Sequence, residues 1–224
     1  MNADEHHQQQ LEQEQQAMGI IAKDASESNF EPAPEGTHVA VCTMMVDLGM
    51  QTSVWDGIEK AQHKVYLGFS LVNEPLTYER DGETVNTFMA IGQQYTLSLH
   101  EKAKLRQHLE AWRGRRFTDA ELEGFDITAV LGAPCMVSVV HNQSNGKTYA
   151  NIAGISSLVK GMEKPTYTGE LIVYHEGKRD QADKLPRWIR RKLGLESDAP
   201  INVHGQAQHQ SDDQPFNDDL DIPF

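Results

Sequence analysis

Aromatic and basic residues stand close together at several places in the middle of the sequence. Aromatic rings stack on nucleobases and lysine side chains neutralise phosphates, so this combination is typical of sites that bind single-stranded nucleic acid. The sequence favours Trp55 and Tyr66 as stacking residues, whereas Tyr95 and Tyr149 fit stacking and half-buried packing equally well. The lysines that accompany these rings are Lys60, Lys64, Lys147 and Lys160.

A second basic group consists of Arg113, Arg115 and Arg116, which surround Gly114. The glycine marks the expected end of a helix, where cations interact favourably with the helix dipole. Helix capping explains one of these arginines but not three, so we expect the group to contact phosphates. Ordinary solvated surface is the alternative. A third group, Arg190–Lys192, is a candidate for docking the acidic end of the chain.

A metal-dependent nuclease is a competing hypothesis, because clustered carboxylates hold catalytic metal ions. Its ligands would be Asp119, Glu121, Glu123, Asp126 and His141. However, the four acids follow a helix-cap pattern, and the sequence has no phosphate-loop, nucleophile-elbow or C-x-x-C signature. His6 and His7 are adjacent, and two neighbouring histidines are more often solvated side chains than metal ligands. We therefore expect no catalysis, no cofactor and no metal site.

Charge is distributed unevenly along the chain. The formal net charge of −13 divides into −7 for residues 1–36, +1 for 37–194 and −7 for 195–224. A near-neutral body thus lies between two acidic arms, and the whole-chain charge does not exclude a nucleic-acid partner.

Composition favours a cytoplasmic protein. Cys42 and Cys135 lie in apolar, strand-like runs and form neither a disulfide framework nor a metal-site pattern. No apolar run approaches the roughly 20 residues of a membrane span. The acidic, Gln-rich start is unlike a signal peptide.

Alternation and turn residues predict three strands before any helix. The first is expected to end at Gly49, and in the second Lys64 and Tyr66 face away from the core. Phe69 and Phe88 are expected to be core residues. The three strands cover residues 37–47, 64–72 and 87–97, with a hairpin signal at Asp81-Gly82.

A helical period follows. Leu105, Leu109 and Trp112 form an apolar stripe at i, i+4 and i+7. Ser98–Glu101 and Thr118–Glu121 have the spacing of capping boxes, which predicts that a helix begins at each. Two more strands are expected over 134–141 and 148–158, around a turn at Asn145-Gly146.

Three strands, a helix and two strands is the order of a five-stranded oligonucleotide/oligosaccharide-binding (OB) barrel, so we expect a mainly β fold of this class. An unrelated α+β domain is the alternative. In the extension we expect a strand over 168–175 and a helix over 185–195 whose Leu185, Trp188, Ile189 and Leu193 pack on the barrel. The expected organisation is a disordered acidic arm (1–36), the barrel (37–164), the extension (165–195) and a disordered acidic tail (196–224).

Several blocks in order resemble a family of bacteriophage single-stranded-DNA-binding proteins. The blocks are L-R-Q-H-L-E-A-W-R-G-R-R-F-T-D-A-E-L-E-G-F-D, L-G-A-P-C-M-V-S-V-V-H and G-K-T-Y-A-N-I-A-G-I. The ending D-D-L-D-I-P-F is similar to the acidic tip of bacterial single-stranded-DNA-binding proteins, with Leu220 as a departure. The tip residues that match are Asp218, Asp219, Asp221, Ile222, Pro223 and Phe224.

The resemblance implies a protein that coats single-stranded DNA in phage replication, recombination or repair, within the host cytoplasm. It also implies that the tip recruits replication or repair enzymes. An adaptor that uses the tail and never touches DNA is the alternative. The sequence leaves self-association open, and no membrane partner is expected.

Overall fold

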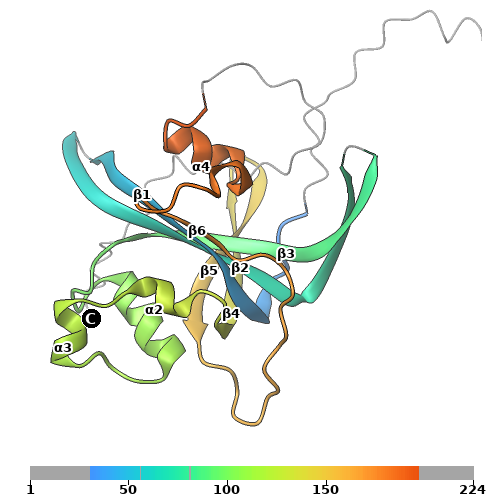
Figure 1. Ribbon diagram of the computed structural model, residues 1–224, viewed down its shortest axis with the longest axis horizontal. Coiled ribbons are helices and arrows are strands. Elements are labelled where there is room, and N and C mark those ends of the chain that lie inside the picture. Colours follow the sequence, from blue (N-terminus) through green and yellow to red (C-terminus); the bar gives the residue numbers. More distant parts are fainter. Residues whose placement is uncertain (1–30, 56, 81, 197–224) are drawn as a thin grey trace, which may run out of the picture. The chain divides into compact units, whose positions relative to one another are not determined.

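A computed structural model describes residues 31–55, 57–80 and 82–196 of the chain (Figure 1). The chain divides into two compact units, Met1–Glu31 and Pro32–Phe224. Only Glu31 of the first unit is described, and everything below concerns the second unit. The expectations for the N-terminal arm up to residue 30, and for the acidic tail from residue 197 onward, lie outside the described residues.

A strongly curled antiparallel sheet forms the body of this unit. Its strands follow the order β3-β2-β1-β4-β5. The two edge strands, β3 and β5, approach each other to within 8 Å between Cα atoms. The result is a half-barrel, in which a short β6 adds to β1 in parallel (Figure 1). The strands are β1 (Gly36–Trp55), β2 (Ile58–Arg80), β3 (Glu83–Thr96), β4 (Pro134–Ser144), β5 (Lys147–Ser156) and β6 (Ile172–Tyr174).

Helices are few and short. The longest, α2, lies between β3 and β4 in the chain, so the expected order of three strands, a helix and two strands is confirmed. Among the described residues, no helix has the length and apolarity needed to cross a membrane. The helices are α2 (Lys104–Arg113), α3 (Asp119–Glu123), α4 (Arg187–Lys192) and the 3-10 turns η1 (Ile127–Val130) and η2 (Ala182–Lys184).

Turn residues decide where the strands reverse. The expected turn at Asn145-Gly146 joins β4 and β5, with both residues at positive φ (50° and 74°) as a tight hairpin requires. The expectation that the first strand ends at Gly49 is wrong. Gly49 adopts φ 67° at a register shift after Asp47, and β1 continues past this bulge to Trp55.

The inner face of the sheet encloses the main core. The apolar stripe of α2 packs into it, as predicted: Leu105, Leu109 and Trp112 are buried, and the Trp112 ring lies 5.7 Å from that of Phe69. The prediction for Phe88 is wrong. This ring is half-buried outside the core, 6.4 Å from the ring of Tyr167, because β3 at this point belongs to a hairpin that extends beyond the core.

The two predicted capping boxes have different outcomes. The Thr118 side chain accepts a hydrogen bond from the backbone NH of Glu121, and the Glu121 carboxylate accepts one from the backbone NH of Thr118. The capping box predicted at α3 is therefore confirmed. The box at Ser98 is wrong, because α2 begins only at Lys104 and its N-cap residue Ala103 makes no side-chain bond. Ser98 Oγ instead accepts a local hydrogen bond of 3.1 Å from the NH of His100.

A second apolar cluster covers the outer face of β1 and β2, and we call it the outer cluster. Its fully buried centre is Val46 on β1 and Ile189 on α4. The packing predicted for the helix of the extension is therefore confirmed, and Figure 1 shows α4 in orange on this side of the sheet. The cluster consists of Val46, Leu48, Tyr66, Tyr174, Leu185 and Ile189, with Met44, Ile172, Ala182, Trp188 and Leu193 against it.

Both cysteines are buried and unbridged, as expected. Cys42 lies in β1 and Cys135 opposite Ala40 in β4, so each acts as a small apolar core residue. Burial raises the pKa of the Cys42 thiol to about 12 and also raises that of Cys135. Neither group is a reactive thiolate near neutral pH.

Candidate nucleic-acid interface

Tyr66 lies on the outer face of the sheet, as alternation predicts, but it is not an exposed ring. Only 5% of its surface is accessible, and Trp188 of α4 meets it edge-on at 5.1 Å between ring centroids. The expectation that Tyr66 stacks on bases is therefore wrong for this arrangement of the chain. The sequence reasoning failed because a covering layer is not visible in the alternation of a single strand.

Removing that layer would be costly. Burying a large apolar side chain stabilises a protein by roughly 1.5–3 kcal/mol, so exposing Val46, Leu185 and Ile189 alone would cost about 5–9 kcal/mol. All three are at most 2% exposed. Binding with micromolar affinity yields only about 8 kcal/mol. Detaching the segment that carries β6 and α4 would therefore consume most or all of the free energy gained on binding. We treat this segment as a permanent part of the surface.

Tyr95 is a core residue, so its predicted stacking role is wrong too. It is 1% exposed, and its hydroxyl lies 2.9 Å from Nδ1 of His108 on α2. Burial, with a smaller effect from the charge of Lys104, lowers the pKa of His108 to about 4. The imidazole is therefore neutral at pH 7, and its hydrogen bond with the Tyr95 hydroxyl ties α2 to β3.

Two of the three clustered arginines hold the local structure together. Arg115 donates two hydrogen bonds, of 2.7 and 2.8 Å, to the carboxylate of Glu121, and Arg113 binds the same carboxylate. The Arg113 guanidinium also lies over the Phe117 ring, 4.4 Å from its centroid. Arg116 is exposed. The cluster as a whole therefore does not form a phosphate track, and only Arg116 keeps that role as a prediction.

Two of the four carboxylates considered for a nuclease, Glu121 and Asp126, have structural partners. Glu121 is held by two arginines and by the NH of Thr118, and the hydrogen bonds from Arg115 and Thr118 hold the pKa of Glu121 well below its usual range. Asp126 caps η1 by accepting from the NH of Thr128 at 2.9 Å. In residues 31–196, leaving aside 56 and 81, no group of three His, Cys, Asp or Glu side chains could hold a metal ion.

The β1–β2 hairpin, defined here as residues 49–55 and 57–64, extends beyond the core. Three apolar side chains on it are strongly exposed: Met50 (64%), Val54 (66%) and Ile58 (70%). Trp55 ends β1 opposite Ile58, and its side chain lies outside the described part of the chain. Clustered exposed apolar side chains are typical of binding surfaces.

Lysines lie on one face of this hairpin. Lys60 is exposed and stands opposite Ser53, in line with Ile58 because opposite residues and every second residue share a face. Lys64 lies on the same face nearer the core, where its ammonium donates to the Thr96 hydroxyl at 2.9 Å. Two of the predicted DNA-contact residues, Lys60 and Lys64, thus lie on one face of the hairpin, and the role of Trp55 stays a prediction from the sequence.

The β4–β5 hairpin carries the other predicted pair. Lys147 is exposed directly after the turn, and Tyr149 is half-buried opposite Asn142. Val140 on β4 is 41% exposed. Lys160 is exposed in the loop after β5. These residues remain candidates for DNA contact.

The basic residues of α4 differ in exposure. Arg187 and Arg190 are half-buried, and both form ion pairs with Glu196, at 3.3 and 2.5 Å. Arg190 also donates to the carbonyl oxygen of Asp183. Arg191 and Lys192 are exposed.

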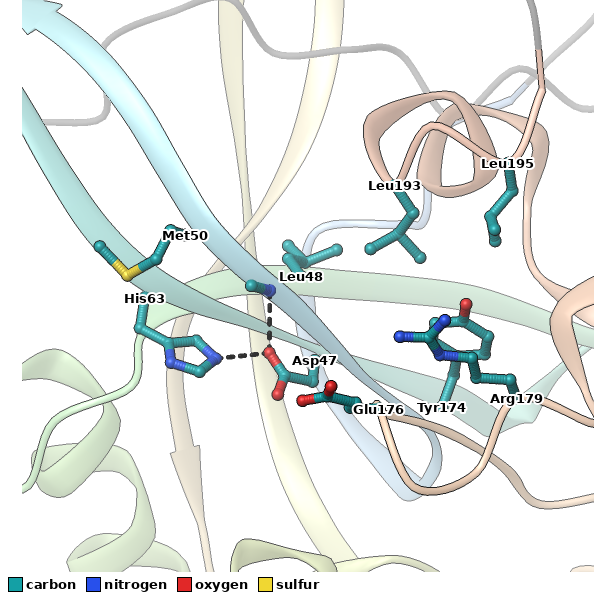
Figure 2. Close-up of a pocket in the computed structure, with 10 residues that line it drawn as sticks. Asp47, Leu48, Met50, His63, Tyr174, Glu176, Arg179, Leu193 and Leu195 are labelled. Atoms are coloured by element: carbon teal, nitrogen blue, oxygen red, sulfur yellow. Dashed lines mark hydrogen bonds and ion pairs between the residues drawn. The ribbon is translucent and has the colours of Figure 1, made fainter.

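A hollow of about 370 Å³ lies between β1 and the end of α4, and sequence reasoning missed it (Figure 2). Asp47 Oδ1 accepts from the NH of Gly49 and lies 2.6 Å from Nε2 of His63, so this pair braces the bulge in β1. Only strand register brings these side chains together, and no local motif signals it. The lining residues are Asp47, Leu48, Gly49, Met50, His63, Tyr174, Glu176, Arg179, Leu193 and Leu195.

Comparison of the chain with models of protein families and with curated protein sequences gives no match. The features that bear on its function are the curled sheet, the two hairpins that carry lysines and the covered outer face.

Proposed function

We propose that this protein binds single-stranded DNA without sequence preference and without catalysis, and that its half-barrel is an OB fold. The strand order, the helix between β3 and β4 and the approach of β3 to β5 support that fold class. The resemblance to bacteriophage single-stranded-DNA-binding proteins points to the same function, in phage DNA replication, recombination or repair.

One observation carries the proposal: the β1–β2 hairpin combines an exposed lysine, Lys60, with exposed apolar side chains beyond the core. Lys60 stands on one face with Ile58, while Met50 and Val54 are exposed on the other. Cations attract phosphates, and apolar or aromatic surfaces accept bases of any sequence. Lys147 and Tyr149 repeat the combination on the β4–β5 hairpin.

A labelled dT oligonucleotide tests the proposal directly. We expect saturable binding in fluorescence anisotropy that is much tighter for the single strand than for a duplex of equal length. Each neutralised phosphate of a single strand should contribute about −0.7 to the slope of log K against log salt concentration. Equal affinity for the duplex, or no binding at low salt, would contradict the proposal.

We also propose that the acidic tip recruits a protein partner. Asp218, Asp219 and Asp221 mimic phosphates, and Ile222, Pro223 and Phe224 provide an apolar anchor. Anchors of this kind typically contribute about 2 kcal/mol or more each at an interface. The tip lies outside the described residues, so sequence alone supports this part.

Deleting residues 212–224 removes five acids and the anchor. We expect the truncated protein to bind dT oligonucleotides more tightly at low salt, because the acids no longer compete with phosphates, and to lose its partner. Anisotropy measures the first effect, and pull-down with host replication and repair proteins measures the second. A scrambled tip of the same composition should restore the competition but not the recruitment. Unchanged values for both readouts would reject the role of the tip.

A protein adaptor that does not bind DNA is a second candidate. The exposed Met50, Val54 and Ile58 favour it, since an apolar hairpin also suits a protein surface. The dT titration separates the two functions, because an adaptor of this kind would show no saturable binding.

A further inference from the structure

We propose that the outward face of α4 contacts the phosphates of the bound strand and replaces the covered sheet face as part of the DNA-binding surface. This inference rests on the proposed function and names a surface for it. In the sequence, the basic group on this helix was a candidate for docking the acidic tail, and contact with phosphates is a different role for the same residues.

The orientation of α4 is fixed by its buried residue. Ile189 is fully buried in the outer cluster. Successive residues of a helix are rotated by about 100°, so Arg187 and Arg191, two positions before and after Ile189, both point nearly away from the sheet. They lie four residues apart on one face, with about 5–6 Å between their Cβ atoms. One extended strand can therefore contact both.

Positive charge dominates this face. Four of the six residues of α4 are basic: Arg187, Arg190, Arg191 and Lys192. Arg187 and Arg190 share the carboxylate of Glu196, which follows the helix. The helix itself contains four basic residues and no acid, and Arg191 and Lys192 are exposed, so this segment is suited to attract polyanions.

The anchoring suits a rigid phosphate contact. Trp188 packs edge-on against Tyr66, and Arg190 is tied to the carbonyl oxygen of Asp183, so the helix cannot turn freely. The hollow beside the helix is lined by Leu193 and Leu195 on one side and by Asp47 and Met50 of β1 on the other. Figure 2 shows Leu193 and Leu195 near the end of α4, and Asp47 and Met50 on β1, around the same hollow, so α4 ends near the base of the β1–β2 hairpin. A strand on α4 can therefore continue onto that hairpin.

Arg191→Glu tests the inference, with Lys102→Glu as the matched control. Both residues are exposed and each change alters the net charge equally, but Lys102 precedes α2, which packs on the opposite face of the sheet. In anisotropy titrations with a dT oligonucleotide, Arg191→Glu should lower affinity at least about fivefold and reduce the salt slope by about 0.7 per lost contact. Lys102→Glu should leave both near wild type.

A second measurement does not depend on the charge reversal. A photoreactive amino acid at position 191 should crosslink the oligonucleotide, whereas one at position 102 should not. If the wild-type protein binds DNA but Arg191→Glu binds equally well and position 191 gives no crosslink, the α4 surface is refuted while the proposed function stands. If the wild-type protein binds no single strand, the proposed function fails and the inference with it.

Discussion

Replacing Ile189 with aspartate is expected to detach α4 from the outer face and to weaken binding of single-stranded DNA by about tenfold or more, through loss of its phosphate contacts. Ile189 is fully buried, and a carboxylate cannot remain there without a partner. The segment should therefore leave the sheet, which limited proteolysis of the region after β5 can detect.

The direction of the change in affinity distinguishes two models of binding. If α4 is part of the DNA-binding surface, detaching it lowers affinity. If the strand instead binds the sheet beneath it, exposing Tyr66 raises affinity, and that result would contradict the model. Ile189→Val is the control, since it costs only about 0.5–1.5 kcal/mol and should keep α4 in place. Far-UV circular dichroism verifies that the sheet stays folded.

Replacing Trp112 with alanine is expected to lower the free energy of unfolding by about 3–5 kcal/mol. The ring is 6% exposed and packs on Phe69, and its indole NH donates to the carbonyl oxygen of Pro134 at 2.8 Å. The substitution therefore opens a cavity between α2 and the sheet and removes that hydrogen bond.

Chemical denaturation measures this loss. Trp112→Phe is the control, because it keeps an aromatic ring and removes the hydrogen bond, which typically contributes about 1 kcal/mol. Phenylalanine should therefore recover most of the stability that alanine loses. A loss below about 1 kcal/mol for Trp112→Ala would show that α2 is not integral to the core.

Local features of the fold could be predicted from the sequence because they depend on neighbouring residues. The stripe Leu105, Leu109 and Trp112 follows helical spacing wherever the helix packs, and Asn145-Gly146 supports a tight hairpin because both residues tolerate positive φ. The capping box at Thr118 formed for the same reason. The similar spacing at Ser98 failed, since the chain turns locally before α2 begins.

Site residues were harder to predict, because their roles depend on contacts far along the chain. Tyr66 alternates outward as expected, yet Trp188 covers it from 122 positions away in the sequence. From the sequence, Arg113 and Arg115 were plausible phosphate-binding residues. In the folded chain both instead bind the carboxylate of Glu121, and Arg113 also lies over the Phe117 ring. The hollow beside Asp47 and His63 depends on strand register, which no short motif reveals.

The sequence by itself thus determined the order of the five main strands and the helix among them, the apolar stripe of that helix and the uneven distribution of charge, since these follow from period, turn chemistry and residue type. Only the tertiary structure decided which rings and cations remain accessible. Accessibility depends on the whole folded chain. A side chain that points away from the core on one strand can still be buried by a segment that is distant in the sequence, as Tyr66 is by Trp188.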